Sequence, residues 1–210
     1  GLRSEWYENL EIIRRESRRA NIPFWGFVLS TPHLSYPQPT IASLRLQVYS
    51  NLAYGAQGIQ YYTYWTPKDH DNFNYRNGPV SYDGKKTKTY NIVKTMNTEI
   101  RTIGSLFHNA DVVSVRHLLR LPKGTKQQDT TPLNIKKMMV IGKEGAIVSQ
   151  FTKNGKQYLA LVNKDYRSKM TVDIVWSNNI PVQITKQLKT MKTKKRYTVA
   201  AGDILVFRLS

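Results

Sequence analysis

The sequence contains no cysteine among its 210 residues. Disulfide bonds, thiolate metal sites and a cysteine nucleophile are therefore excluded. Histidine is nearly as scarce, and its few copies lack the spacing of metal ligands, so we expect neither a metal site nor a cofactor. The four histidines are His33, His70, His108 and His117.

Acidic residues are also few, with 14 against 32 lysines and arginines, which gives a formal net charge of +18. The imbalance is strongest after Asp111, where 19 basic residues face 5 acidic ones. Such an excess is typical of a solvated lysine-rich surface, or of a protein whose partner is an acidic glycan or a nucleic acid. Because no recognition helix or nucleic-acid motif accompanies the basic residues, we do not expect nucleic acid as the partner.

Long apolar runs are missing as well. No stretch approaches the ~20 apolar residues that a membrane-spanning helix needs, so we expect no membrane span. Residues 1–4 lead directly into a charged helical pattern, which is not how a signal peptide begins. The leading glycine is typical of a cleaved tag, so we expect the natural N-terminus to lie upstream.

The first half of the chain alternates helical and strand patterns. Ser4 is a suitable cap for a first helix, which Asn21 ends. Two apolar, aromatic-rich runs have the composition of parallel strands that are buried on both faces, so Trp25 is expected in a core. The order predicts an α/β unit over residues 1–110, with its two strands paired in parallel. The expected elements are helices over 4–20, 40–55 and 88–104 and strands over 22–29 and 58–65.

From Asp111 onward the pattern changes to the apolar–polar alternation of short strands. Asn154-Gly155 is a type I′ hairpin signal between two of them, and the basic residues of Lys186–Arg196 alternate with Thr and Leu as on a strand. The second half, residues 111–210, is therefore predicted to be an all-β antiparallel sandwich. The expected strands cover residues 111–118, 134–141, 146–152, 156–163, 170–176, 180–188 and 203–209.

One segment carries a family resemblance. Residues 22–33 are IPFWGFVLSTPH and residues 44–65 are LRLQVYSNLAYGAQGIQYYTYW. An apolar strand, a proline-rich loop, an Arg-led helix, an Ala-x-Gly-Ala-x-Gly turn at Ala53–Gly58 and an aromatic strand end occur in the same order in family-42 glycoside hydrolases. Residues 5–115 resemble the end of these β-galactosidase-like barrels.

The resemblance implies a fold. Residues 1–110 would be the last two strands and helices of a (β/α)8 TIM barrel, and 111–210 an accessory β-sandwich. A full barrel has eight strands, so an N-terminal barrel segment or an oligomer mate would have to complete it. The resemblance also implies carbohydrate as the partner, a part in polysaccharide degradation, and a secreted or periplasmic location.

The catalytic residues of the family do not carry over. Aligned on Pro32, the family's glutamate nucleophile corresponds to Leu29, and the acid of the fourth barrel strand would lie upstream. Retaining hydrolysis needs two carboxylates about 5 Å apart, so we expect this chain alone to be inactive. Asp69 and Asp71 are the remaining candidates for a replacement acid or base, although loop aspartates more often cap turns.

The loops that follow the two strands supply the candidate substrate-binding residues. Aromatic rings stack on the apolar faces of sugars, and histidine and arginine can hydrogen-bond to sugar hydroxyls. Three functions stay open: part of a glycoside hydrolase, a non-catalytic glycan-binding protein that has lost its nucleophile, or a basic polyanion-binding module. The candidate residues are Trp65, His33, Tyr36, His70, Phe73, Tyr75 and Arg76.

Overall fold

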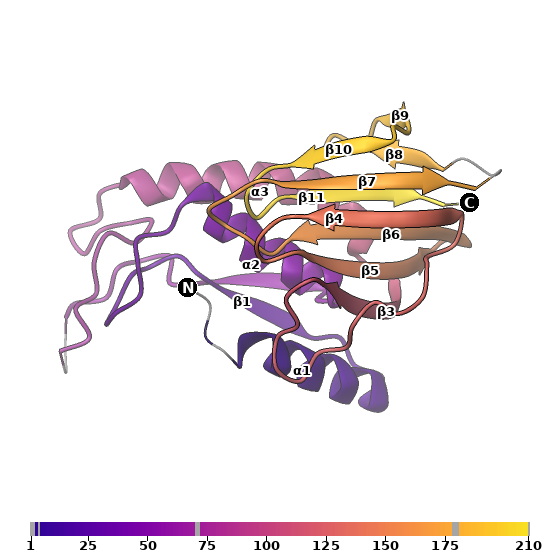
Figure 1. The fold of residues 1–210 in the computed structure, drawn as a ribbon. Helices are drawn as coiled ribbons and strands as arrows, with labels where there is room; N and C mark the ends of the chain where they lie inside the picture. The colour runs from indigo at the N-terminus through magenta and orange to yellow at the C-terminus, as the bar shows by residue number, and fades with distance from the viewer. Residues whose placement is uncertain (1–2, 4, 70–71, 178–180, 210) are drawn as a thin grey trace.

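The computed structural model describes residues 3, 5–69, 72–177 and 181–209. Over these residues the fold is mixed, with three helices, a short parallel sheet and antiparallel sheets (Figure 1). None of the helices in these ranges is long and apolar enough to cross a membrane. Ser4, the predicted helix cap, and the candidates His70 and Asp71 lie outside the described residues.

The first half follows the predicted order of elements, with shorter strands. Asn21 ends the first helix in the left-handed conformation, at φ 53°. Thr40 begins the second helix through a reciprocal capping box with Ser43. The predicted strand over 58–65 ends early, and Trp65 beyond it forms only an isolated bridge with Val80. The elements are α1 (Trp6–Ala20), β1 (Trp25–Leu29), α2 (Ile41–Ala53), β2 (Gly58–Tyr62) and α3 (Lys88–Phe107).

The two strands β1 and β2 pair in parallel, as predicted, with Leu29 opposite Tyr62. One face of this sheet packs on α2, where Val28 is buried and a side chain at Gly26 would collide with Asn51. The other face is open: Trp25 is 60% and Phe27 63% exposed. Trp25 therefore does not lie in a core formed by the described residues, because only one side of the sheet has a covering layer. The open apolar face agrees with the expectation that further barrel strands are needed to cover it.

The second half consists of antiparallel sheets, as predicted. Asn154 and Gly155 both have positive φ, at 50° and 72°, which confirms the type I′ signal of the hairpin. Two short strands were not among the expected ones: β9, which lies within the basic segment that alternates as on a strand, and β10, which begins at its last residue, Arg196. The strands are β3 (Asp111–Leu118), β4 (Ile135–Ile141), β5 (Ala146–Lys153), β6 (Lys156–Asn163), β7 (Met170–Trp176), β8 (Val182–Ile184), β9 (Thr190–Lys192), β10 (Arg196–Val199) and β11 (Ile204–Arg208).

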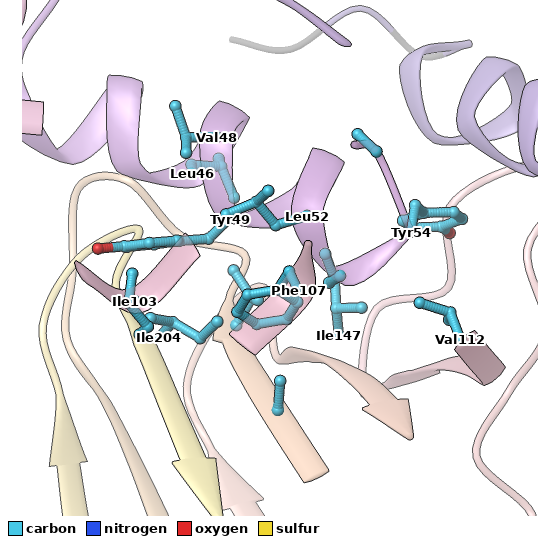
Figure 2. Close-up of a cluster of buried hydrophobic side chains, with 14 of the residues drawn as sticks. Leu46, Val48, Tyr49, Leu52, Tyr54, Ile103, Phe107, Val112, Ile147 and Ile204 are labelled. Carbon is cyan, nitrogen blue, oxygen red and sulfur yellow. The ribbon is translucent and has the colours of Figure 1, made fainter. Parts of the chain in front are cut away.

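These strands form a six-stranded sheet, in the order β3-β5-β6-β11-β8-β9, and a three-stranded sheet, in the order β10-β7-β4. One face of the larger sheet packs on the smaller sheet, through side chains such as Leu161 and Phe207. Its other face packs on α2 and α3, where Ile147 and Ile204 meet Phe107 and residues of α2 (Figure 2). Successive residues of β11 are therefore buried alternately in two different hydrophobic cores.

Helix α2 lies between the two sheet systems. Val28 of β1 and Ile147 of β5 belong to the same buried cluster as α2 residues such as Leu52. Ser149 Oγ of β5 donates a 2.7 Å hydrogen bond to the carbonyl of Ala53 at the end of α2. The predicted domain boundary near residue 110 falls in the turn between α3 and β3 and remains a prediction, and this core contains residues from both sides of it.

A turn of the sandwich also touches α2 directly. Gly202, between β10 and β11, has φ +67°, and a Cβ there would lie 2.1 Å from the carbonyl oxygen of Ala42 and 3.0 Å from the amide of Leu46. Its own amide donates to the carbonyl of Asp165 at 2.8 Å. Glycine is needed here for two reasons, the left-handed backbone and the absence of space for a side chain.

A charged network joins the helices to the sandwich. Glu99 of α3 accepts hydrogen bonds from Arg45 and from Tyr49, the latter at 2.6 Å, and lies 3.2 Å from the ammonium of Lys186. Lys186 also binds Asp203, at 3.0 Å. Burial alone would raise the pKa of Glu99, but the hydrogen bonds from Arg45 and Tyr49 and the charge of Lys186 outweigh it and lower the pKa. The carboxylate therefore stays ionised and holds two cations.

Replacing Glu99 with glutamine is expected to destabilise the chain by about 2–4 kcal/mol, because it leaves two mostly buried cations short of a counter-charge. Urea denaturation measures this difference as a lower midpoint. Asp83→Asn, which breaks an exposed pair with Lys85, is the matched control and should leave the midpoint almost unchanged. Equal midpoints for the two variants would contradict the role given to the network.

A second buried polar group holds α1 against β3. The ring of His117 meets that of Tyr7 edge-on, with centroids 5.1 Å apart, and its Nε2 lies 2.9 Å from the hydroxyl of Tyr54. Because Tyr54 gives its proton to Glu11, at 3.0 Å, Nε2 of His117 is the donor in the pair. Burial, aided by the positive charge of Lys164, lowers the pKa of His117 to about 3.

His117→Gln is expected to flatten part of the pH dependence of stability. The unfolded chain takes up a proton on this histidine near its ordinary pKa of ~6.5, but the folded chain does so only near pH 3. The contribution of His117 is thus complete above about pH 6.5 and is lost toward pH 3, at up to about 1.4 kcal/mol per pH unit.

We therefore expect the difference in unfolding free energy between the native chain and His117→Gln to narrow as the pH of a urea titration falls from about 7.5 to about 4.5. The control is His108→Gln, which removes an exposed histidine that takes no part in the contact with Tyr54. A difference that stays constant for His117→Gln would show that this side chain titrates normally.

Candidate functional site

The loops that follow β1 and β2 are bound to one another. The amide of Leu34 donates to the carbonyl of Phe73 at 2.5 Å, and that of Arg76 donates to the carbonyl of Pro32 at 3.1 Å. The second loop is anchored by the buried Thr66, whose hydroxyl accepts the amide of Gly78 and donates to the carbonyl of Val80. Both loops leave the carboxyl ends of the strands, so side chains distant in sequence meet at one edge of the sheet.

His33 is the centre of an aromatic cluster at this edge. Its ring lies 5.0 Å from that of Tyr36, 5.3 Å from Tyr75 and 5.4 Å from Tyr62, measured between centroids. Phe73 stacks on Tyr75, with rings 5.6 Å apart and an interplanar angle of 6°. Four of the predicted binding residues, His33, Tyr36, Phe73 and Tyr75, are thus brought together.

The cluster also carries polar groups. The hydroxyls of Tyr62 and Tyr75 lie 2.9 Å apart, and this hydrogen bond raises the pKa of Tyr75 to about 12. The Tyr75 hydroxyl therefore remains protonated at neutral pH. The His33 Nδ1 lies 3.0 Å from the carbonyl of Thr31, which orients the ring.

A cleft of about 740 Å³ opens beside the cluster. His33, Tyr36 and Tyr62 line it, together with Leu29, the last residue of β1. The predicted place of Leu29, at the carboxyl end of a parallel strand, is therefore confirmed, and its amide is held by the side-chain oxygen of Gln47 at 2.8 Å. Among the described residues lining the cleft, Glu5 is the one carboxylate.

Arg76 and Asp69 hold the loop rather than face the cleft. The Arg76 guanidinium donates to the carbonyls of Asn74 and Tyr36, at 2.8 and 3.1 Å. Asp69 accepts the amide of Tyr75 at 3.4 Å, which agrees with the turn-capping alternative for this aspartate.

Trp65 stands apart from the aromatic cluster. Its ring lies against Gly84, 3.4 Å from the place of a Cβ there, and half of its surface is exposed. Tyr62, by contrast, was not predicted as a site residue. The signal for it is the strand register: Tyr62 pairs with Leu29, so the two side chains share the open face of the sheet.

In the part of the chain that the structure describes, no group of three or more metal-binding side chains comes together. The candidate site is therefore an aromatic and hydroxyl-bearing cleft, with one carboxylate at its lining.

Comparison with known proteins gives a weak similarity. The sequence matches no model of a known protein family, and no curated protein matches it. Among solved structures, the chain is similar to an apo exo-carrageenase of family GH42 from Bacteroides ovatus, with 13% sequence identity and a TM-score of 0.21. The match covers 91% of this chain but 23% of that enzyme's chain, and it is a weak structural similarity to a glycoside hydrolase.

Proposed function

We propose that this chain binds an oligosaccharide or polysaccharide in the cleft at the carboxyl ends of β1 and β2. The observation that carries the proposal is the convergence of His33, Tyr36 and Tyr62 at that cleft, with Tyr75 stacked on His33 beside it. Tyrosine and histidine rings offer flat faces for the CH groups of a sugar, and their polar atoms can hydrogen-bond to its hydroxyls.

We further propose that β1 and β2 are the last two strands of a larger glycosidase-type (β/α) barrel. The amide of Ser30 donates to Tyr62 and the carbonyl of Phe24 accepts from Gln57, so the even-numbered residues of β1 face β2. The backbone groups of Trp25 and Phe27 then face the opposite edge, where no strand is paired among the described residues. An N-terminal barrel segment or an oligomer mate would supply the missing strands and cover the open face.

The same geometry argues against hydrolysis by this chain alone. Leucine at position 29 can act neither as nucleophile nor as acid, and Glu5 has no second carboxylate beside it in the described lining of the cleft. Two alternatives follow. The complete protein is a hydrolase whose carboxylates lie elsewhere in its sequence, or it is a glycan-binding protein without a nucleophile. A glutamate at the end of a fourth strand upstream would favour the hydrolase.

The binding proposal can be tested with Tyr75→Ala. Removal of this ring takes away the ring that stacks on His33 and the partner of the Tyr62 hydroxyl, and both His33 and Tyr62 line the cleft. Loss of a contact worth about 1–1.5 kcal/mol should weaken binding by roughly five- to tenfold. Affinity electrophoresis in gels containing a neutral galactan measures the effect.

Tyr82→Ala is the matched control, because Tyr82 is an exposed tyrosine outside the aromatic cluster. It should bind galactan like the native chain. Trp65→Ala tests whether Trp65, which was predicted to bind substrate but lies outside the aromatic cluster, contributes to galactan binding. If Tyr75→Ala is retarded by galactan as strongly as Tyr82→Ala and the native chain, the sugar site is not at His33.

A second test concerns chemistry. The chain should release no aryl group from nitrophenyl β-galactosides above the blank rate, because a retaining site needs a carboxylate pair. The control is an active β-galactosidase under the same conditions. Turnover that disappears in Asp69→Asn or Asp71→Asn would show that a loop aspartate replaces the missing nucleophile.

A further inference from the structure

Four lysines lie at one end of the smaller sheet, two on each side of its central strand β7, and we call them the lysine patch. Lys136 and Lys137 belong to β4, where Lys137 pairs with Val175. Lys194 and Lys195 come just before β10: the carbonyl of Lys194 accepts the indole N–H of Trp176 at 2.9 Å, and that of Lys195 accepts the amide of Ile174 at 2.8 Å. All four side chains are exposed.

The charge of the lysine patch is not balanced by nearby acids. In the described second half, Asp173 is held by Arg196, Glu144 by Arg120, and Asp203 by Lys186, while Asp129, in the loop before β4, forms no salt bridge with a described residue. The Asp165 carboxylate accepts backbone amides of its own turn. None of the four patch lysines forms a salt bridge with a described carboxylate.

The spacing of the strands makes the four charges act together. Strands β4 and β10 both pair with β7, so the two halves of the lysine patch are two strand spacings apart, which is about 10 Å. That distance is close to the Debye length of ~8–10 Å at physiological salt, so the fields of the two halves overlap. The lysine patch is therefore a concentrated positive surface rather than four separate solvated charges.

The surface between the lysines does not suit nucleic acid bases. The one aromatic ring there, Trp176, packs edge-on against Phe207 with centroids 5.0 Å apart, and its N–H is already bonded. Among the described residues of this surface, no ring is thus available for base stacking, and lysine lacks the planar fork with which arginine reads guanine. Between the lysines lies the exposed Val175, and the exposed Met139 follows Lys137 along β4.

We propose that the lysine patch binds a linear acidic polysaccharide, sulfated or carboxylated, as a second glycan site distinct from the cleft at His33. The anionic groups of the polymer meet the lysines on both sides of β7, and the apolar face of a sugar unit rests on Val175. The choice of a polysaccharide over nucleic acid rests on the proposed carbohydrate function, but the anionic character of the ligand rests on the lysine patch alone.

The test uses the full chain with all four patch lysines changed to glutamine. A control chain carries the same change at four exposed lysines elsewhere, Lys94, Lys143, Lys156 and Lys169, so the two variants have equal net charge. Binding to dextran sulfate and to polygalacturonate is measured by titration calorimetry at several salt concentrations, with neutral dextran as the blank.

We expect the patch variant to lose at least about tenfold in affinity for dextran sulfate, polygalacturonate or both, and to show a shallower salt dependence, since fewer counterions are exchanged. The control variant should lose much less. Which of the two polymers binds more tightly distinguishes sulfate from carboxylate recognition. Equal losses in the patch and control variants would overturn the proposal, because they would show a response to net charge only.

Two further measurements separate this site from others. A DNA duplex that binds through the same four lysines as tightly as the acidic polysaccharides, at equal salt, would overturn the assignment to a glycan. Tyr75→Ala should leave binding of dextran sulfate unchanged, and the patch variant should keep its affinity for neutral galactan. An error in the proposal for the cleft would thus appear in the galactan measurements, and an error in the proposal for the lysine patch would appear in the measurements with acidic polymers.

Discussion

The burial of α2 between two unrelated sheets is the constraint on which the rest of this structure depends. None of the residues of this helix is exposed, and Arg45 is its single charged residue. Such a helix is stable only when its whole circumference is covered. The parallel pair β1 and β2 covers one side, and α3 with the six-stranded sheet covers the other. The cleft at the carboxyl ends of the strands and the sandwich are therefore supported by the same element.

The polar contacts around α2 reinforce this arrangement. The one charge on the helix, Arg45, is turned toward Glu99 and the nearby Asp203, which belong to α3 and to the sandwich. Its terminal carbonyl at Ala53 is satisfied by Ser149 of β5. Lys186 pairs with the same two carboxylates and so links Glu99 of α3 to Asp203 of the sandwich. Packing and charge thus join the two halves of the chain along one surface.

Much of the fold was predictable because its signals are local. Apolar runs around Val28 and Ile59 predicted the strand pair, and Asn154-Gly155 predicted a hairpin whose backbone has the required positive φ. The loop candidates His33 and Tyr75 could be found since each follows a predicted strand. These features depend on residue type and short spacing, which a single sequence contains.

What was missed depends on contacts between distant residues. Tyr62 joins the cleft because of its register with Leu29, and Trp65 is drawn away by the turn at Gly84. The ion pair of Glu99 with Lys186 spans 87 positions, and nothing in the local pattern of either residue points to the other. The open face of β1, by contrast, agrees with the expectation that two strands cut from a larger barrel leave apolar surface uncovered.

The turn at Gly202 has a consequence for how this protein can vary in evolution. Position 202 lies in a sandwich turn, where substitutions are usually tolerated, yet any side chain there would press on Ala42 and Leu46 in α2. Leu46 and the neighbouring Gln47 line the cleft, and Gln47 holds the amide of Leu29. A substitution in this remote turn would therefore disturb the wall of the cleft, so relatives that keep the cleft should keep this glycine even where the strands around it have diverged.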